Sequence, residues 1–500
     1  MVPGCYIILC LILSYMTHRP RYIILFILLI QVSSIASQSL TGLKSKTIKI
    51  DNLMFIRQDG FIEVPEDREK NGSRMLKLPV RIIKSSGDVS KEPVFYLDGG
   101  PGGTNISSTT NTLLLQNHDL IFVGYRGVDG STILTNKKLG KAMMGKDNQL
   151  LSNESIDNIT TAIRLYFGQQ ESKGINISSY TIMDVIEDLE YTRKTLGYGK
   201  INLLGFSYGT RVALLYSHKY PESINRIVLA GANPPGHFYW FPEKTDQILK
   251  MWDDLYKARS KGSVIEAMKK AFDSMPEKWS FYKLDKDKIK CTAFLFMSQN
   301  DMAVMMFDSF FRAADKNDYS GLYALSLFFD MAMKKIVWGD MYSKGASADM
   351  VIGKDYRAIL RDSGNSTVLG PNMSLLLWGS IDGWNKSLIP EEYRKMRVSM
   401  IETLIVSGDL DVPTPTDFAR EELLPYLPEG QHVTLKDISH GDIQTSQPEA
   451  YYNMITSFFD TGKADTTLYK PQEIDLDPDR KLYKIAKWGY PAIVIYNWFN

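Results

Sequence analysis

Apolar and polar positions follow two recurring patterns along this chain: short runs that are wholly apolar, and longer stretches with apolar residues three or four apart. The first pattern is typical of buried strands and the second of helices with one buried face. Two buried strands are predicted at residues 93–97 and 120–125, and four further strands at residues 201–204, 224–229, 403–407 and 432–435. Helices are predicted among them, at residues 157–167, 182–196, 210–220 and 448–459. This alternation predicts a mostly parallel central sheet flanked by helices.

The pattern changes on either side of these elements. Residues 47–64 and 76–83 are predicted to be the strands of an antiparallel hairpin that precedes the sheet. Between residues 235 and 397 amphipathic helical stretches dominate, and the segment is rich in methionine and aromatic residues. The longest of these stretches are residues 245–261, 263–274 and 303–333. An insertion of helices between strands of a sheet predicts a cap, whose apolar side chains fill its own core and secondarily line a substrate pocket.

These boundaries divide the chain into predicted parts. The catalytic core comprises residues 37–234 and 398–465, the helical cap is inserted at residues 235–397, and residues 466–500 form a C-terminal extension. The last twenty residues are apolar and aromatic. They either pack on the domain as a final helix or lie at a membrane or partner surface.

The N-terminus has the pattern of an export signal. Arg19 and Arg21 precede the short apolar run 22–32, and small residues follow as far as Ala36. We therefore predict a signal peptide over residues 1–36, cleaved after Ala36, and a secreted or periplasmic protein.

Two alternatives to this leader remain open. Met16 is a possible true start, because residues 1–15 are apolar where a signal peptide is ordinarily charged. The leader could also stay uncleaved as a membrane anchor, although the run 22–32 is short for a bilayer span.

Composition excludes several function classes. The chain has 500 residues, 44% of them hydrophobic, and a formal net charge of +1. Such a balanced charge gives no support for nucleic-acid binding. A nucleotide-binding glycine motif and a Cys/His ligand cluster are both missing from the sequence, so we predict no cofactor and no metal. Cys291 is the only cysteine outside the leader.

Ser207 is the candidate nucleophile. It is the central residue of the G-x-S-x-G pentapeptide at residues 205–209, with an apolar strand predicted before it and a helix predicted after it. A sharp strand-to-helix turn of this kind strains the serine backbone and exposes its hydroxyl at the carboxyl edge of the sheet. The flanking glycines allow strand and helix to approach closely.

The serine requires a base, and the chain has only six histidines. His440 follows the last predicted strand, where hydrolases with a nucleophile elbow keep their base, and we predict it to be the base. The remaining five lie in the leader, before a strand, in the helix behind Ser207, at the start of the cap or in a strand: His18, His118, His218, His237 and His432.

The acid of the triad should lie between the nucleophile and the base in chain order. Asp409 and Asp411 both follow the strand at residues 403–407. We assign the acid to Asp411. Asp409 is nearer the glycine of this turn and is predicted to bind backbone amides.

The oxyanion formed by attack on a carbonyl needs fixed donors. One is the backbone N–H of Tyr208, directly after the nucleophile. The second is predicted in the glycine loop after residue 97, from Gly100 or its neighbour Gly99. Removing one such donor typically costs about 3 kcal/mol of transition-state stabilisation.

Taken together, these motifs resemble the prolyl iminopeptidases and tripeptidyl aminopeptidase-like α/β-hydrolases. Residues 98–103 resemble their HGGPG loop. Residues 125–131 resemble the D-x-R-G-x-G-x-S motif at the end of a strand, and residues 205–211 resemble their elbow. Residues 408–415 are similar to their G-x-x-D-x-x-T-P acid loop, and 439–441 to their histidine loop. The resemblance implies an α/β-hydrolase fold and an exopeptidase acting on a free N-terminus.

Two residues depart from the family pattern: Asp98 replaces a histidine or asparagine, and Gly124 stands where an aspartate is common. Both bear on the substrate more than on bond cleavage. Binding a cationic α-amino group would need a carboxylate, for which the sequence favours no single candidate in the cap among Asp253, Asp254, Asp308, Asp330 and Asp340.

The sequence therefore predicts a serine aminopeptidase that takes a peptide substrate. A carboxylesterase or lipase-like enzyme acting on small esters with the same triad is the alternative, because the fold alone does not decide between them. A non-catalytic binding protein on a hydrolase scaffold is a third, weaker hypothesis. Peripheral membrane contact through the leader or the tail stays open, and the oligomeric state is not predicted.

Overall fold

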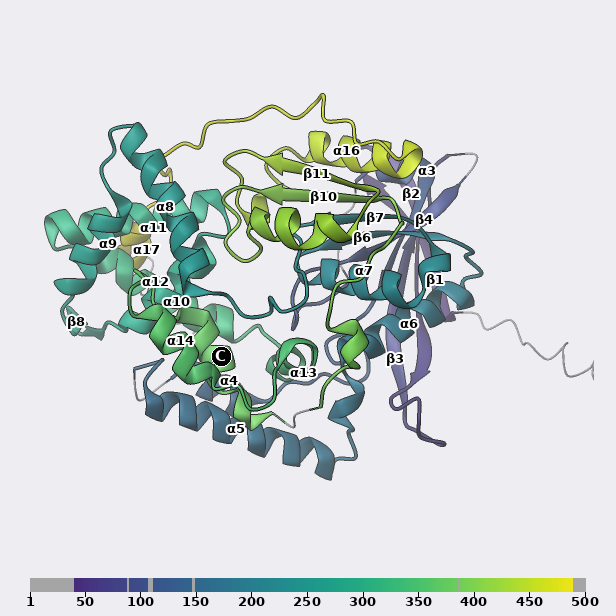
Figure 1. Cartoon of the computed structure of the whole chain (residues 1–500), viewed down its shortest axis with the longest axis horizontal. Helices are drawn as coiled ribbons and strands as arrows, with labels where there is room; N and C mark the ends of the chain where they lie inside the picture. Colours follow the sequence, from purple (N-terminus) through teal and green to yellow (C-terminus); the bar gives the residue numbers. More distant parts are fainter. Residues whose placement is uncertain (1–39, 88–89, 107–110, 146–148, 385–386, 489–500) are drawn as a thin grey trace, which may run out of the picture.

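A nine-stranded sheet forms the centre of the protein (Figure 1). The fold is described from a computed structural model, over residues 40–87, 90–106, 111–145, 149–384 and 387–488. The strands are β1 (Thr41–Ile50), β2 (Leu53–Pro65), β3 (Met75–Ile83), β4 (Lys91–Leu97), β5 (His118–Val123), β6 (Ile201–Phe206), β7 (Ile224–Ala230), β10 (Thr403–Gly408) and β11 (Gly430–Leu435). Their order is β1-β2-β3-β5-β4-β6-β7-β10-β11. Antiparallel pairs from β1 to β5 lead into parallel pairs from β5 to β11, so the predicted α/β architecture is confirmed.

Successive side chains of the parallel strands enter opposite layers of the core. Phe95 and Ile121 pack with the layer that contains α6 (Ile182–Thr195) and α7 (Tyr208–Lys219). Their neighbours along the strands pack in the other layer, with α3 (Leu114–Asn117) and α16 (Pro448–Thr461). Because both faces are covered, these strands are largely apolar, as the short runs in the sequence indicate.

The prediction of an antiparallel hairpin before the sheet is wrong in detail. Residues 47–64 are not one strand: β1 ends at Ile50 and β2 begins at Leu53. Asp51 and Asn52 between them have φ of 44° and 71° and form the two-residue turn that joins antiparallel strands. The first three described strands therefore form a meander.

The segment between β7 and β10 is helical, as predicted, apart from the short hairpin of β8 (Lys278–Trp279) and β9 (Tyr282–Lys283). Its α-helices are α8 (Pro242–Ala258), α9 (Val264–Asp273), α10 (Lys286–Phe296), α11 (Asn300–Lys316), α12 (Ser320–Met333), α13 (Trp338–Asp349), α14 (Tyr356–Gly364) and α15 (Asn372–Trp378). The stretch predicted at residues 303–333 is two helices, because Asn317 adopts a left-handed conformation with φ of 53° after α11.

A helix from before the elbow also contacts this cap. The helix α5 (Asn153–Ser172), next to α4 (Lys137–Ala142), runs beneath it in Figure 1. Asp157 on α5 forms an ion pair with Arg357 on α14, at 2.8 Å. The exact domain boundaries stay a prediction.

A buried ion pair joins the cap to α7, the helix that follows the elbow. Arg211 of α7 contacts Asp349 of α13 at 2.9 Å, and neither side chain is more than 1% exposed. Arg211 also donates to the carbonyl and side-chain oxygens of Asn233. Such a pair holds its elements in place because removing one partner would leave an unpaired buried charge.

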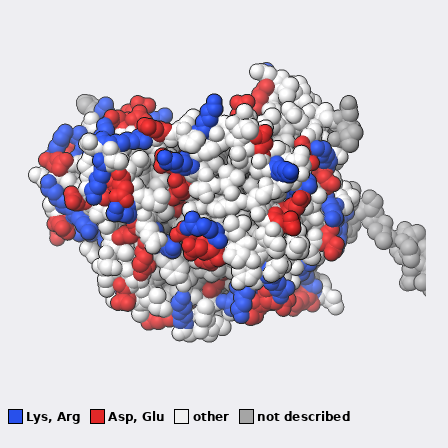
Figure 2. Space-filling view, turned by 45° about the horizontal axis from the view of Figure 1, so that its top comes forward, with Lys and Arg blue, Asp and Glu red and all other residues white. Residues whose placement is uncertain are grey.

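The described part of the tail packs on the domain. Helix α17 (Leu482–Trp488) lies against α12, with Leu482 buried and the Tyr483 ring 3.7 Å from the Arg312 guanidinium. Residues 489–500 and the predicted leader, residues 1–36, lie outside the described residues. None of the helices in the described ranges is long and apolar enough to cross a membrane. Basic and acidic residues are interspersed over the face shown in Figure 2.

Candidate active site

Ser207 occupies a strained turn between β6 and α7. Its φ of 53° and ψ of −120° are rarely adopted by a residue with a side chain. The turn is held by hydrogen bonds from Ser207 N–H to the Ala230 carbonyl and from Thr210 N–H to the Ser207 carbonyl, both 2.9 Å. A Cβ at position 209 would lie 1.9 Å from the Leu97 carbonyl oxygen, so only glycine lets α7 begin this close to β4. The sequence pattern of an elbow therefore corresponds to an elbow in the structure.

Asp411 and His440 meet at the carboxyl edge of the sheet. The imidazole Nδ1 lies 2.7 Å from Asp411 Oδ2. Asp411 follows β10 and has no solvent exposure, whereas His440 begins the 3-10 turn η7 (His440–Asp442) and is 8% exposed. This arrangement leaves Nε2 as the nitrogen that can accept a proton.

Thr414 contacts both residues of this pair, and no role was predicted for it from the sequence. Its N–H donates to Asp411 Oδ1 and its hydroxyl to Asp411 Oδ2, both at 2.7 Å. The same hydroxyl lies 3.1 Å from His440 Nδ1. The signal in the sequence was the Asp-x-x-Thr spacing, which allows a side chain to bond backbone and hydroxyl three residues ahead.

The elbow and the imidazole are neighbours. The ring of Phe206, directly before Ser207, lies 4.9 Å from that of His440 between centroids. A Cβ at Gly231, where φ is 61°, would lie 2.8 Å from His440 Cε1, so glycine makes room for the ring. In the part of the chain that the structure describes, no hydrogen bond joins the Ser207 hydroxyl to the imidazole; in unliganded enzymes this bond often tightens only when substrate binds.

The other described histidines are placed away from this constellation. His118 contacts the Glu92 carbonyl and Asp460, His237 contacts Glu422, and His432 contacts Ser407. His218 is on α7 behind the elbow, where burial and the nearby Arg397 lower its pKa to about 4.

Asp409 takes the structural role predicted for it. Its Oδ1 accepts from Ile438 N–H at 3.3 Å, which ties the acid loop to the loop before His440. Burial, with a contribution from Asp437, raises the pKa of Asp409.

The glycine loop lies against the elbow. A Cβ at Gly99 would lie 3.3 Å from Ser207 Cβ, and Gly100 has φ of 146°, which glycine tolerates. Asp98 Oδ1 accepts from Gly99 N–H at 2.7 Å, so the aspartate that departs from the family pattern braces the loop. Tyr208, whose N–H is among the unpaired first amides of α7, follows Ser207.

The second departure from the family pattern has a structural cause. A Cβ at Gly124 would lie 2.7 Å from Cβ of Asp129. The Asp129 side chain occupies the space beside Gly124, and its carboxylate accepts from the N–H groups of Asn105 and Tyr125, both at 2.9 Å. Asn105, which is fully buried, in turn accepts from Asp98 N–H at 2.7 Å.

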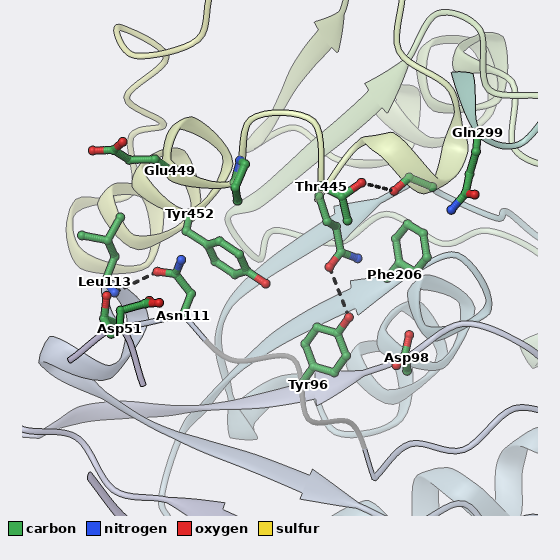
Figure 3. Close-up of a pocket in the computed structure, with 14 residues that line it drawn as sticks. Asp51, Tyr96, Asp98, Asn111, Leu113, Phe206, Gln299, Thr445, Glu449 and Tyr452 are labelled. Carbon is green, nitrogen blue, oxygen red and sulfur yellow. Dashed lines mark hydrogen bonds between the residues drawn. The ribbon is translucent and has the colours of Figure 1, made fainter. Parts of the chain in front are cut away.

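A cavity of about 810 Å³ adjoins the site (Figure 3). Its lining includes Asp98, Phe206 and Gly441, which are the chain neighbours of Gly99, Ser207 and His440. Figure 3 shows Asp98 and Phe206 at one side of the cavity and Glu449 and Asp51 at the other. The described lining contains these three carboxylates and neither lysine nor arginine. Burial raises the pKa of Asp98.

The five cap aspartates considered for the substrate amine serve other purposes. Asp253, Asp254, Asp308 and Asp330 form ion pairs with Lys257, Lys250, Lys481 and Lys288. Asp340 is buried and accepts from the backbone of the glycine loop. The described residues contain no group of three His, Cys, Asp or Glu side chains that could hold a metal ion.

Comparison with known families agrees with this geometry. Residues 92–326 match the alpha/beta hydrolase fold family, and residues 377–469 match the family described as TAP-like protein. The chain therefore has the α/β-hydrolase fold.

Curated proteins that are similar to this chain include peptidases. Tripeptidyl aminopeptidase of Streptomyces lividans is 26% identical over 206 residues, 38% of each chain. Serine protease Hip1 of Mycobacterium tuberculosis (strain ATCC 25618 / H37Rv) is 28% identical over 187 residues, which is 35% of this chain and 36% of Hip1. The putative hydrolase YuaR of Escherichia coli (strain K12) is 27% identical over 168 residues, 31% of this chain and 30% of YuaR. The match thus spans less than two fifths of these relatives.

We expect Thr414→Val to weaken catalysis and folding together. The substitution removes the hydroxyl that bonds the buried Asp411 carboxylate, a loss of about 1.5–3 kcal/mol for a bond to a charged group. If about 1.4 kcal/mol of this loss appears as weaker stabilisation of the transition state, kcat decreases about tenfold. Urea unfolding and steady-state kinetics measure the two effects, and Thr414→Ser, which keeps the hydroxyl, is the control. Wild-type values in Thr414→Val would contradict the role assigned to Thr414.

Proposed function

We propose that this α/β-hydrolase is a serine aminopeptidase that cleaves residues or short peptides from a free N-terminus. The observation that carries the proposal is the 2.7 Å contact of His440 with the buried Asp411, beside the strained elbow of Ser207. A peptidase is favoured over an esterase by the similarity to tripeptidyl aminopeptidase and Hip1 and by the TAP-like segment.

In the proposed reaction Ser207 attacks the peptide carbonyl while His440 Nε2 takes the hydroxyl proton. The oxyanion is stabilised by the N–H groups of Tyr208 and Gly100. Gly99, the other residue considered for this role, already donates its N–H to Asp98 Oδ1. His440 then gives its proton to the leaving amine, and the acyl-enzyme is cleared by water that the same imidazole activates. Asp411 holds the imidazole tautomer and stabilises its positive charge.

The cavity lining supports a substrate with a positive charge. Asp98 directly precedes Gly99 and lines the cavity. Its carboxylate therefore borders the space that a substrate in the site would fill. A protonated α-amino group is the cation that distinguishes an aminopeptidase substrate from a neutral ester. We propose that Asp98 binds it.

The first test compares substrates and a nucleophile variant. An aminoacyl- or tripeptidyl-anilide with a free N-terminus should be hydrolysed, the N-acetylated form should be hydrolysed at least about tenfold more slowly, and Ser207→Ala should reduce the rate by about 10⁴-fold or more. Circular dichroism of Ser207→Ala checks that the fold is retained. Rapid turnover of short acyl esters, with no difference between free and blocked peptides, would instead identify an esterase.

The second test concerns Asp98. Asp98→Asn keeps an oxygen for Gly99 N–H but removes the charge, so KM for the free-amine substrate should rise about tenfold with little change in kcat. Because burial raises the pKa of Asp98, lowering the pH should protonate it and raise the wild-type KM, and this dependence should vanish in Asp98→Asn. Asp254→Asn, which removes a charge from the cap surface, is the control. An unchanged KM in Asp98→Asn would contradict the assignment.

We further propose that the enzyme is exported and that residues 1–36 are its leader. The support is the sequence pattern: two arginines, a short apolar run and small residues up to Ala36. N-terminal sequencing of protein recovered outside the cytoplasm should begin at Ser37. An intact leader in the membrane fraction would indicate the anchored alternative.

A further inference from the structure

The glycine loop, which carries the proposed oxyanion donor Gly100, is hydrogen-bonded to the cap. Gly102 N–H donates to Asp340 Oδ2 at 3.0 Å, and the Gly102 carbonyl accepts from Val337 N–H at 3.3 Å. Val337 is the N-cap residue of α13, and Asp340 lies in its first turn. Both backbone polar groups of this loop residue are therefore satisfied by one cap helix.

Two glycines allow this close contact. A Cβ at Gly102, where φ is 87°, would lie 3.1 Å from Ile336 Cγ2 and 3.2 Å from the Val337 carbonyl oxygen. A Cβ at Gly127, where φ is 85°, would lie 2.8 Å from Asp340 Oδ1. A side chain at either position would displace the carboxylate or the start of α13 from the loop.

The Asp340 carboxylate is itself held by Lys344, which is anchored to the core. Lys344, one turn further along α13, forms an ion pair with Asp340, and neither side chain is more than 1% exposed. Lys344 Nζ also donates to the Arg126 carbonyl at 2.9 Å. The Arg126 side chain is fixed in turn by Asp188 on α6, with two contacts of 2.6 and 2.7 Å. The acceptor for Gly102 thus has a fixed direction.

From this geometry we propose that Asp340 is a positioning residue for hydrolysis: held by Lys344, it fixes the direction in which Gly100 presents its N–H group to the oxyanion. The inference rests on the proposed hydrolase function. Oxyanion donors act only when they are preorganised toward the developing charge, so a loop that relaxes loses transition-state stabilisation without losing substrate contacts. The cap would then contribute to catalysis as well as enclosing the site.

The test measures kcat and KM with a free-amine anilide, together with the rate of labelling by a fluorophosphonate probe, which needs no particular substrate. Asp340→Ala should lower kcat and the labelling rate by about 10- to 100-fold, part of the effect of deleting a donor, and change KM less than about twofold. Asp340→Asn combined with Lys344→Met keeps an oxygen for Gly102 N–H without leaving a buried unpaired charge, and should recover most of kcat. If Asp340→Ala does not fold, Asp340→Glu, which moves the carboxylate by one methylene, should still lower kcat.

Asp253 offers a matched control in the same cap. It is equally buried, pairs with Lys257 one turn away and accepts a backbone N–H, from Ile265 at 3.1 Å, but this amide belongs to the cap and not to the glycine loop. Asp253→Ala should therefore lower the thermal midpoint while leaving kcat and the labelling rate of the folded protein unchanged.

Equal kcat and labelling rates in folded Asp340 and Asp253 variants would overturn the positioning role while leaving the hydrolase proposal intact. A rise in KM with unchanged kcat would also overturn it, because that result places Asp340 in substrate binding. Failure of the wild-type protein to react with either the anilide or the probe would overturn both proposals.

Discussion

The site depends on a carboxylate that is wholly removed from water. Asp411 has no solvent exposure, and such a charge is tolerated only if hydrogen-bond donors surround it. His440 and Thr414 provide these donors, from two loops at the carboxyl edge of the sheet. Burial of the acid therefore requires that the two loops stay together, and their contact brings the imidazole beside the ring of Phe206 at the elbow.

The cap reinforces this edge from two sides. Gly441 N–H, directly after His440, donates to the Ser298 carbonyl at 2.7 Å, and Asn300 N–H donates to Asp442 Oδ2 at the same distance. The glycine loop is bonded to α13 in a corresponding manner through Gly102. The loop of His440 and the glycine loop are thus each attached to the inserted helices, so the cap is a structural support for the candidate site as well as a cover.

The sequence predicted what depends on local pattern. The elbow at Ser207 is specified by adjacent residues, since only glycine fits at position 209 against the Leu97 carbonyl. Chain order left Asp409 and Asp411 as candidates for the acid, and the position of Asp409 nearer the glycine, together with the acid-loop motif, favoured Asp411. The structure brings Asp411 into contact with His440. The largely apolar runs predicted the parallel strands because both faces of that part of the sheet are covered.

What the sequence did not predict depends on tertiary contacts or on residues that tolerate unusual backbone angles. The turn at Asp51 and Asn52 lacks the glycine that usually marks such a hairpin, so two strands were predicted as one. The contact of Asp340 with Gly102 joins segments far apart in the chain, and no periodicity indicates it. Before the fold was known, Asp340 could not be distinguished from the other acidic residues of the cap.

All of the proposed chemistry depends on Ser207 acting as a nucleophile that His440 and Asp411 activate. Mass-spectrometric mapping of the protein after reaction with a fluorophosphonate tests this role. One covalent adduct is expected, on the peptide that contains Ser207, and its formation should require His440 and Asp411. An adduct on a different serine, or undiminished modification of Ser207 after His440→Ala, would contradict it.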